Sequence, residues 1–92
     1  MMRTIVTFAG RVQGVGFRYT VLRIAARHSV AGTVRNLRSG AIEIDVEGEA
    51  GEVATFLADV LAHPPFGARV TGTERRDAEP RLLRTFSEAP TL

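Results

Sequence analysis

The sequence predicts an α+β fold with the element order β-α-β-β-α-β, in which two helices pack on one face of an antiparallel sheet of four to five strands. Three observations predict it. Residues 41–48 alternate apolar and acidic side chains, residues 50–62 repeat apolar side chains at helical spacing, and glycine or proline breaks separate the elements. Because 92 residues suffice for one modest core, we expect a single domain over residues 1–92.

The first two elements are a strand and a helix joined by a glycine-rich loop. A strand is expected at residues 3–9, and the loop occupies residues 10–16. A helix is expected over residues 17–28, because apolar side chains recur there at helical spacing. This spacing places His28 on the packed side of the helix. The strand residues expected on one face are Thr4, Val6 and Phe8.

A β-hairpin is expected next. Strands at residues 30–37 and 41–48 flank a short turn that ends in Ser39 and Gly40. In the second strand the apolar side chains point one way and the acidic side chains point the other way, which predicts a solvated acidic face. The acidic residues are Glu43, Asp45 and Glu47.

The remaining elements complete a ferredoxin-like sandwich. The second helix, at residues 50–62, is ended by Pro64 and Pro65. A weakly patterned fourth strand follows at residues 68–77, and residues 82–89 can supply a short fifth strand at the edge of the sheet.

The composition argues against several classes of partner. The net charge is only +2, and the pI of about 10.4 arises because all 12 basic residues are arginine, so nothing in the charge indicates nucleic-acid binding. No apolar run approaches the roughly 20 residues of a membrane helix. The chain has no cysteine, which excludes disulfides and thiolate metal sites. We therefore expect a cytoplasmic protein without a membrane or nucleic-acid partner.

Residues 10–20, GRVQGVGFRYT, predict a site for a phosphate or a similar oxyanion. Glycines allow backbone N–H groups to turn toward one point, and the beginning of a helix adds unpaired N–H groups and the positive end of its dipole. Arg18, at that beginning, adds a planar fork of donors that suits two oxygens of one anion. The glycines are Gly10, Gly14 and Gly16.

Two motifs carry a family resemblance. The first, G-x-V-Q-G-V-x-F-R, is matched by Gly10, Val12, Gln13, Gly14, Val15, Phe17 and Arg18. The second, G-x-V-x-N-x-x-x-G, is matched by Gly32, Val34, Asn36 and Gly40. With the βαββαβ order, these motifs make residues 3–70 similar to acylphosphatases, and the resemblance weakens beyond. The chain departs from the family's pattern at Ser29, Thr33 and Glu88, the last of which stands where an apolar residue is expected.

The resemblance implies an enzyme that hydrolyses the carboxyl-phosphate bond of acyl phosphates without a metal or another cofactor. It implies that Arg18 binds the phosphoryl group, that Asn36 positions the attacking water, and that the protein acts as a monomer. The loop would supply a cradle of backbone groups for the phosphate, from Gln13, Gly14, Val15, Gly16 and Phe17. His28 and His63 are expected to be structural. The physiological acyl group is not indicated.

Two alternatives belong to other functional classes. An RNA-recognition module shares the βαββαβ order, but it needs aromatic side chains on its open face, where this chain offers acidic ones. A non-catalytic anion-binding domain would keep the same fold. Similar domains occur inside larger carbamoyl-transfer maturation proteins, and we expect no such extension here.

Overall fold

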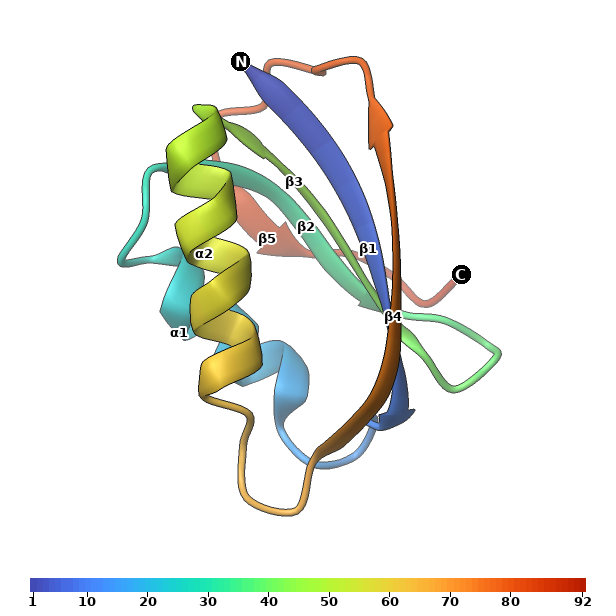
Figure 1. Ribbon diagram of the computed structural model, residues 1–92. Helices are drawn as coiled ribbons and strands as arrows, with labels where there is room; N and C mark the ends of the chain where they lie inside the picture. The colour runs from blue at the N-terminus through green and yellow to red at the C-terminus, as the bar shows by residue number, and fades with distance from the viewer.

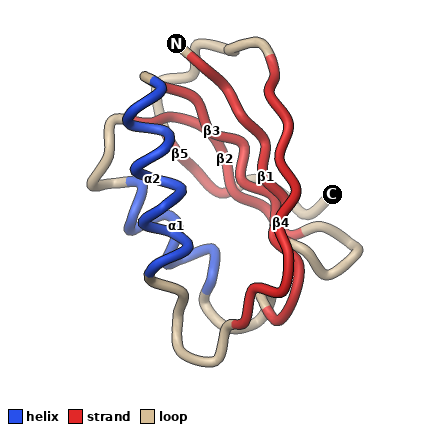
Figure 2. The backbone as a smooth tube through the Cα atoms, in the orientation of Figure 1, coloured by secondary structure: helices blue, strands red, loops and turns tan.

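The computed structural model describes residues 1–92 and confirms the predicted order of elements (Figure 1). Both helices cover the same face of a five-stranded sheet (Figure 2). The elements are β1 (Met2–Arg11), α1 (Phe17–Ala25), β2 (Val30–Asn36), β3 (Ile42–Gly48), α2 (Ala50–Ala62), β4 (Arg69–Ala78) and β5 (Phe86–Glu88). Neither helix is long and apolar enough to cross a membrane.

The sheet has the strand order β4-β1-β3-β2-β5 and is mixed rather than wholly antiparallel. The first four strands pair antiparallel, as predicted, but β5 pairs parallel with β2. The last residue of β4, Ala78, lies at the end of the sheet where β2 begins. Residues 79–85 carry the chain across that end, so β5 begins beside the beginning of β2 and runs in the same direction.

The core lies between the sheet and the two helices. Ile42, Ile44 and Val46 of β3 are fully buried there, as their alternation predicted. Helix α2 contributes the fully buried Phe56, and burial of each such large apolar side chain contributes about 1.5–3 kcal/mol. Leu61 also fits the apolar stripe of α2, but its side chain is half exposed because the stripe is wider than the contact.

Helix α1 is shorter than predicted. It ends at Ala25, where hydrogen bonds of the i→i−4 type give way to tighter i→i−3 bonds donated by the N–H groups of Arg27 and His28. His28 therefore lies in a turn after the helix. Its ring is still packed, 5.9 Å from the ring of Phe56, and this contact explains why its position fits the apolar pattern.

The acidic face of β3 is not solvated as predicted. Asp45 and Glu47 are 6% and 2% exposed. Arg3 donates two hydrogen bonds to the Asp45 carboxylate, at 2.8 and 2.7 Å, and Glu47 accepts bonds from the backbone N–H groups of Arg81 and Leu82. The cause is the segment 79–85, which covers this end of the sheet.

Candidate active site

The loop between β1 and α1 presents a row of unpaired backbone donors. Gly14 and Gly16 have φ values of 74° and 81°, the left-handed region that favours glycine. The first hydrogen bond of α1 runs from the N–H of Thr20 to the carbonyl of Gly16. The N–H groups of residues 17–19 consequently have no acceptor within the helix, and those of residues 13–16 donate none of the protein's hydrogen bonds. Helix α1 also has neither a side-chain cap nor an acidic residue in its first turn.

Gln13 ties this loop to the β2–β3 turn. Its side-chain Nε2 donates hydrogen bonds to the carbonyl oxygens of Leu37, at 2.7 Å, and Ala41, at 2.9 Å. The Gln13 side chain is therefore occupied by the turn, and only its backbone N–H is free for a ligand. The bonds also hold the first motif against the strand that carries the second.

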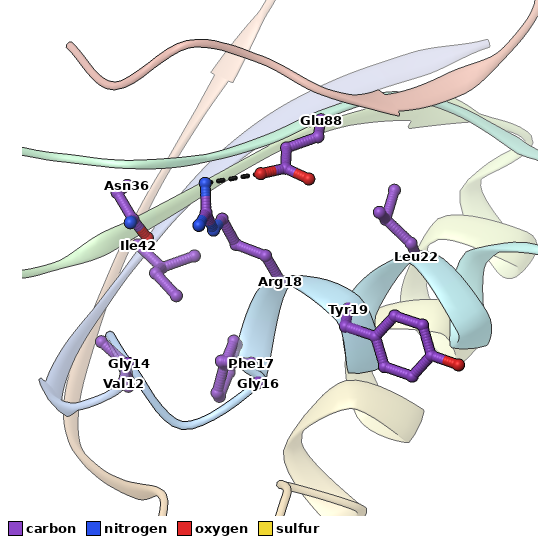
Figure 3. Close-up of a pocket in the computed structure, with 10 residues that line it drawn as sticks. All are labelled: Val12, Gly14, Gly16, Phe17, Arg18, Tyr19, Leu22, Asn36, Ile42 and Glu88. Carbon is purple, nitrogen blue, oxygen red and sulfur yellow. Dashed lines mark ion pairs between the residues drawn. The ribbon is translucent and has the colours of Figure 1, made fainter.

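Arg18 reaches across from the first turn of α1 toward the sheet (Figure 3). Its side chain is 35% exposed, and its Nη1 lies 2.5 Å from Oε2 of Glu88, the last residue of β5. This ion pair is the only polar contact that the guanidinium makes within the protein. The other donors of its planar fork remain available to an anion.

Asn36 is the last residue of β2, and in Figure 3 its carboxamide lies beside the Arg18 guanidinium. The side-chain Oδ1 of Asn36 is buried and has no hydrogen-bond partner. A buried acceptor without a partner costs about 1–3 kcal/mol, so this oxygen is unsatisfied until a donor reaches it.

Five of the seven predicted site residues line one cavity of about 210 Å³. Arg18, Asn36, Gly14 and Gly16 all line it, although they come from different elements. Phe17 lines it too and anchors the beginning of α1 in the core, where it is 2% exposed. Gln13 and Val15 do not line the cavity. The Gln13 side chain bonds to the β2–β3 turn, and the Val15 side chain packs against the core, so both stabilise the loop.

Five further residues line the cavity that the sequence did not place there: the fully buried Val12 and Ile42, and Tyr19, Leu22 and Glu88. Leu22 carried a signal, because it widens the apolar stripe of α1 beyond what the core can cover. Glu88 carried one as well, since it is a charged residue at a position expected to be apolar. Neither of these two sequence signals predicted the ion pair between Glu88 and Arg18.

The two histidines lie away from this cavity and share one carboxylate. His28 contacts Asp59 at 3.0 Å, and His63 contacts the other oxygen of the same carboxylate at 2.8 Å. The hydrogen bond from His28, with the nearby charge of His63, holds the pKa of Asp59 below its usual value. No group of three or more acidic, histidine or cysteine side chains is placed to hold a metal ion.

Comparison with known proteins decides the family. The sequence profile of the acylphosphatase family matches residues 4–87. The chain belongs to the acylphosphatase family. An acylphosphatase of Thermococcus kodakarensis is 43% identical over 77 residues, which cover 84% of each chain. Family membership supports an enzyme that hydrolyses acyl phosphates.

Solved structures agree with this assignment. The crystal structure of an acylphosphatase from Bacillus subtilis superimposes with a TM-score of 0.90 at 33% identity, covering 97% of this chain and 99% of that one. The structure of full-length HypF in its phosphate- and nucleotide-bound form gives a TM-score of 0.91 at 30% identity, covering 98% of this chain but 12% of HypF. The ferredoxin-like α+β fold is thereby confirmed.

Proposed function

We propose that Arg18 and the backbone N–H groups of residues 13–17 bind the phosphoryl group of an acyl phosphate, and that Asn36 orients the water that attacks it. The observation that carries this proposal is that Asn36, a carboxamide whose Oδ1 has no partner in the protein, lines the same cavity as Arg18 and the loop glycines. A carboxamide that can orient water thus lines the same small cavity as the donors for an anion.

The phosphoryl group suits the donors of this cavity. The guanidinium fork of Arg18 can contact two oxygens at once, and the unpaired N–H groups at the beginning of α1 add donors and a positive dipole end. These groups are fixed before substrate binds, so they stabilise charge on the equatorial oxygens without reorganisation during the reaction.

Asn36 acts by orientation rather than as a base. A carboxamide is neutral and can accept one hydrogen bond while it donates another, so it can align a water molecule with the phosphorus. The water oxygen forms a bond to phosphorus as the bond from phosphorus to the carboxyl oxygen breaks. The carboxylate departs with that electron pair, and a phosphate oxygen of the substrate takes the proton of the water.

The residues of the cavity also support a reaction that needs no metal. Glu88 is the only carboxylate among them and is paired with Arg18, and no histidine lines the cavity, so the protein offers a divalent cation no unpaired charged ligand there. Arg18 and the helix dipole supply positive charge instead. A carboxylate leaves easily, so no Lewis acid is required at the leaving group.

A comparison of Arg18→Ala and Arg18→Lys with the unaltered enzyme tests the proposal. We expect hydrolysis of benzoyl phosphate, no loss of rate on addition of a chelator, and a fall in kcat/KM of at least about 10²-fold in both variants, because a point charge cannot replace the fork. Circular dichroism checks folding. Strict dependence on a divalent ion, or full activity in Arg18→Ala, would overturn it.

The two alternative functions predict other outcomes. A non-catalytic anion-binding domain would bind inorganic phosphate but hydrolyse no acyl phosphate. An RNA-recognition module would bind RNA on the face opposite the helices, where Glu43 and Asp45 are engaged by Arg35 and Arg3. The monomeric state, the cytoplasmic location and the single domain stay predictions.

A further inference from the structure

We propose that Glu88 determines which acyl phosphates this enzyme accepts, by favouring neutral or cationic acyl groups over acyl groups that carry a second negative charge. The inference rests on the proposed function, because it assumes that the phosphoryl group binds at Arg18 and the loop.

The backbone fixes Glu88 beside the cavity. Within β5, Glu88 pairs with Val34 of β2, and the N–H of the next residue, Ala89, donates a hydrogen bond of 2.9 Å to the carbonyl of Val34. Two residues earlier, Phe86 packs 5.5 Å from Phe56 of α2. Because side chains of a strand alternate between faces, Glu88 points to the helix side, as Phe86 does.

The charge balance of the cavity is simple. Arg18 and Glu88 are the only charged residues that line it, and they form an ion pair with each other. A bound phosphoryl group would satisfy the positive charge of Arg18. The carboxylate of Glu88 would then face any other charged group of the substrate.

Glu88 lies on the side of the site away from the loop glycines (Figure 3). In Figure 3, Arg18 lies between Glu88 and the loop glycines, Gly14 and Gly16, and Leu22 lies on the Glu88 side. With the phosphoryl group at the loop, the acyl group points toward Glu88 and Leu22, and the 66% exposed Tyr19 lines the same cavity. An apolar acyl group finds apolar contacts there, whereas an anionic one meets a carboxylate.

Glu88 also has an effect that does not depend on the acyl group. Its carboxylate occupies Nη1 of Arg18, so it competes with the phosphoryl group of every substrate. This competition cancels when two substrates with the same phosphoryl group are compared within one variant. Selectivity for the acyl group must therefore be measured as a ratio of two kcat/KM values.

The test compares Glu88→Gln with the unaltered enzyme on three substrates of similar shape: benzoyl phosphate, 4-carboxybenzoyl phosphate and 4-(trimethylammonio)benzoyl phosphate. We expect the substitution to raise kcat/KM for the anionic substrate, relative to the neutral one, by about three- to tenfold, and to lower the relative value for the cationic substrate. In the unaltered enzyme, the preference should weaken as salt is raised.

Glu74→Gln is the matched control, because it removes the same charge from an exposed position on β4, at the opposite edge of the sheet. It should leave the ratios unchanged. If Glu88→Gln changes all three substrates by one common factor, or if the unaltered enzyme shows no salt-dependent preference, the inference is wrong. If the unaltered enzyme hydrolyses none of the three, the proposed function itself fails.

Discussion

The side-chain amide of Gln13 donates a hydrogen bond of 2.7 Å to the backbone carbonyl of Leu37. Leu37 directly follows Asn36, so this bond joins the loop that we propose binds the anion to the strand end that holds Asn36. The bond links positions 24 residues apart, so the Gln13 side chain, which does not line the cavity, connects the two motifs.

Replacing Gln13 should therefore impair both stability and turnover. We expect Gln13→Ala to lower the free energy of unfolding by about 1–2 kcal/mol, because two hydrogen bonds are lost, although each carbonyl keeps one backbone donor. Gln13→Glu should be worse, since its carboxylate would face those carbonyl oxygens. Urea unfolding, read with kcat, checks both variants. Equal stability of Gln13→Ala and the unaltered protein would show that the bonds are dispensable.

Two glycine substitutions should separate the cost of backbone strain from the cost of a steric clash. At Gly16 an added Cβ meets nothing within 4 Å, so Gly16→Ala suffers only from the φ of 81° and should lose about 1–2 kcal/mol of stability. At Gly32 the added Cβ would lie 1.8 Å from the carbonyl oxygen of Asp45 in the neighbouring strand. Gly32→Ala should therefore lose several kcal/mol or fail to fold. Thermal unfolding of the two variants tests this order, and a more stable Gly32→Ala would reverse it.

Stability should fall in acid through Asp45. Burial raises its pKa, but the hydrogen bonds from Arg3 and the charges of Arg81 and Arg3 outweigh burial and hold the pKa below its ordinary value of 3.8. The folded state thus favours the carboxylate, so this contribution is complete above the unfolded pKa and is lost as the pH falls through the folded pKa.

We expect Asp45→Asn to be less stable than the unaltered protein at neutral pH, by about 1–3 kcal/mol, because Arg3 loses its charged partner. The difference should shrink as the pH falls below the ordinary value for an aspartate. Urea unfolding at a series of pH values measures it. If the difference in the free energy of unfolding stays constant down to acid pH, carboxylates other than Asp45 cause the acid sensitivity.

Local patterns predicted the elements well where one face packs against the core. The apolar residues of α2 recur at helical spacing, and this pattern predicted a helix with ends at residues 50 and 62, as the structure has it. A helix without such a stripe would have no apolar face to bury against the sheet. The same rule extended α1 too far, to His28, because a residue in the turn beyond the helix packs against Phe56 as a helical residue would.

Contacts between distant segments could not be predicted in this way. The alternation of β3 placed Asp45 and Glu47 on one face, but no local pattern shows that residues 79–85 cover that face. The two motifs alone predicted that Arg18 and Asn36 lie in one site, and both line the same cavity. The contact of Arg18 with Glu88 depends on the parallel pairing of β5 with β2, which short-range periodicity does not encode.

If Arg18 binds the phosphoryl group whereas Asn36 acts on water, Asn36→Ala should lose turnover and keep phosphate binding. Its kcat for benzoyl phosphate is measured beside its Kd for inorganic phosphate. We predict a fall in kcat of about 10²- to 10³-fold with a Kd within about threefold of the unaltered enzyme, because the phosphate donors remain in place. A variant that keeps its kcat, or that loses phosphate binding as Arg18→Ala does, would contradict the account.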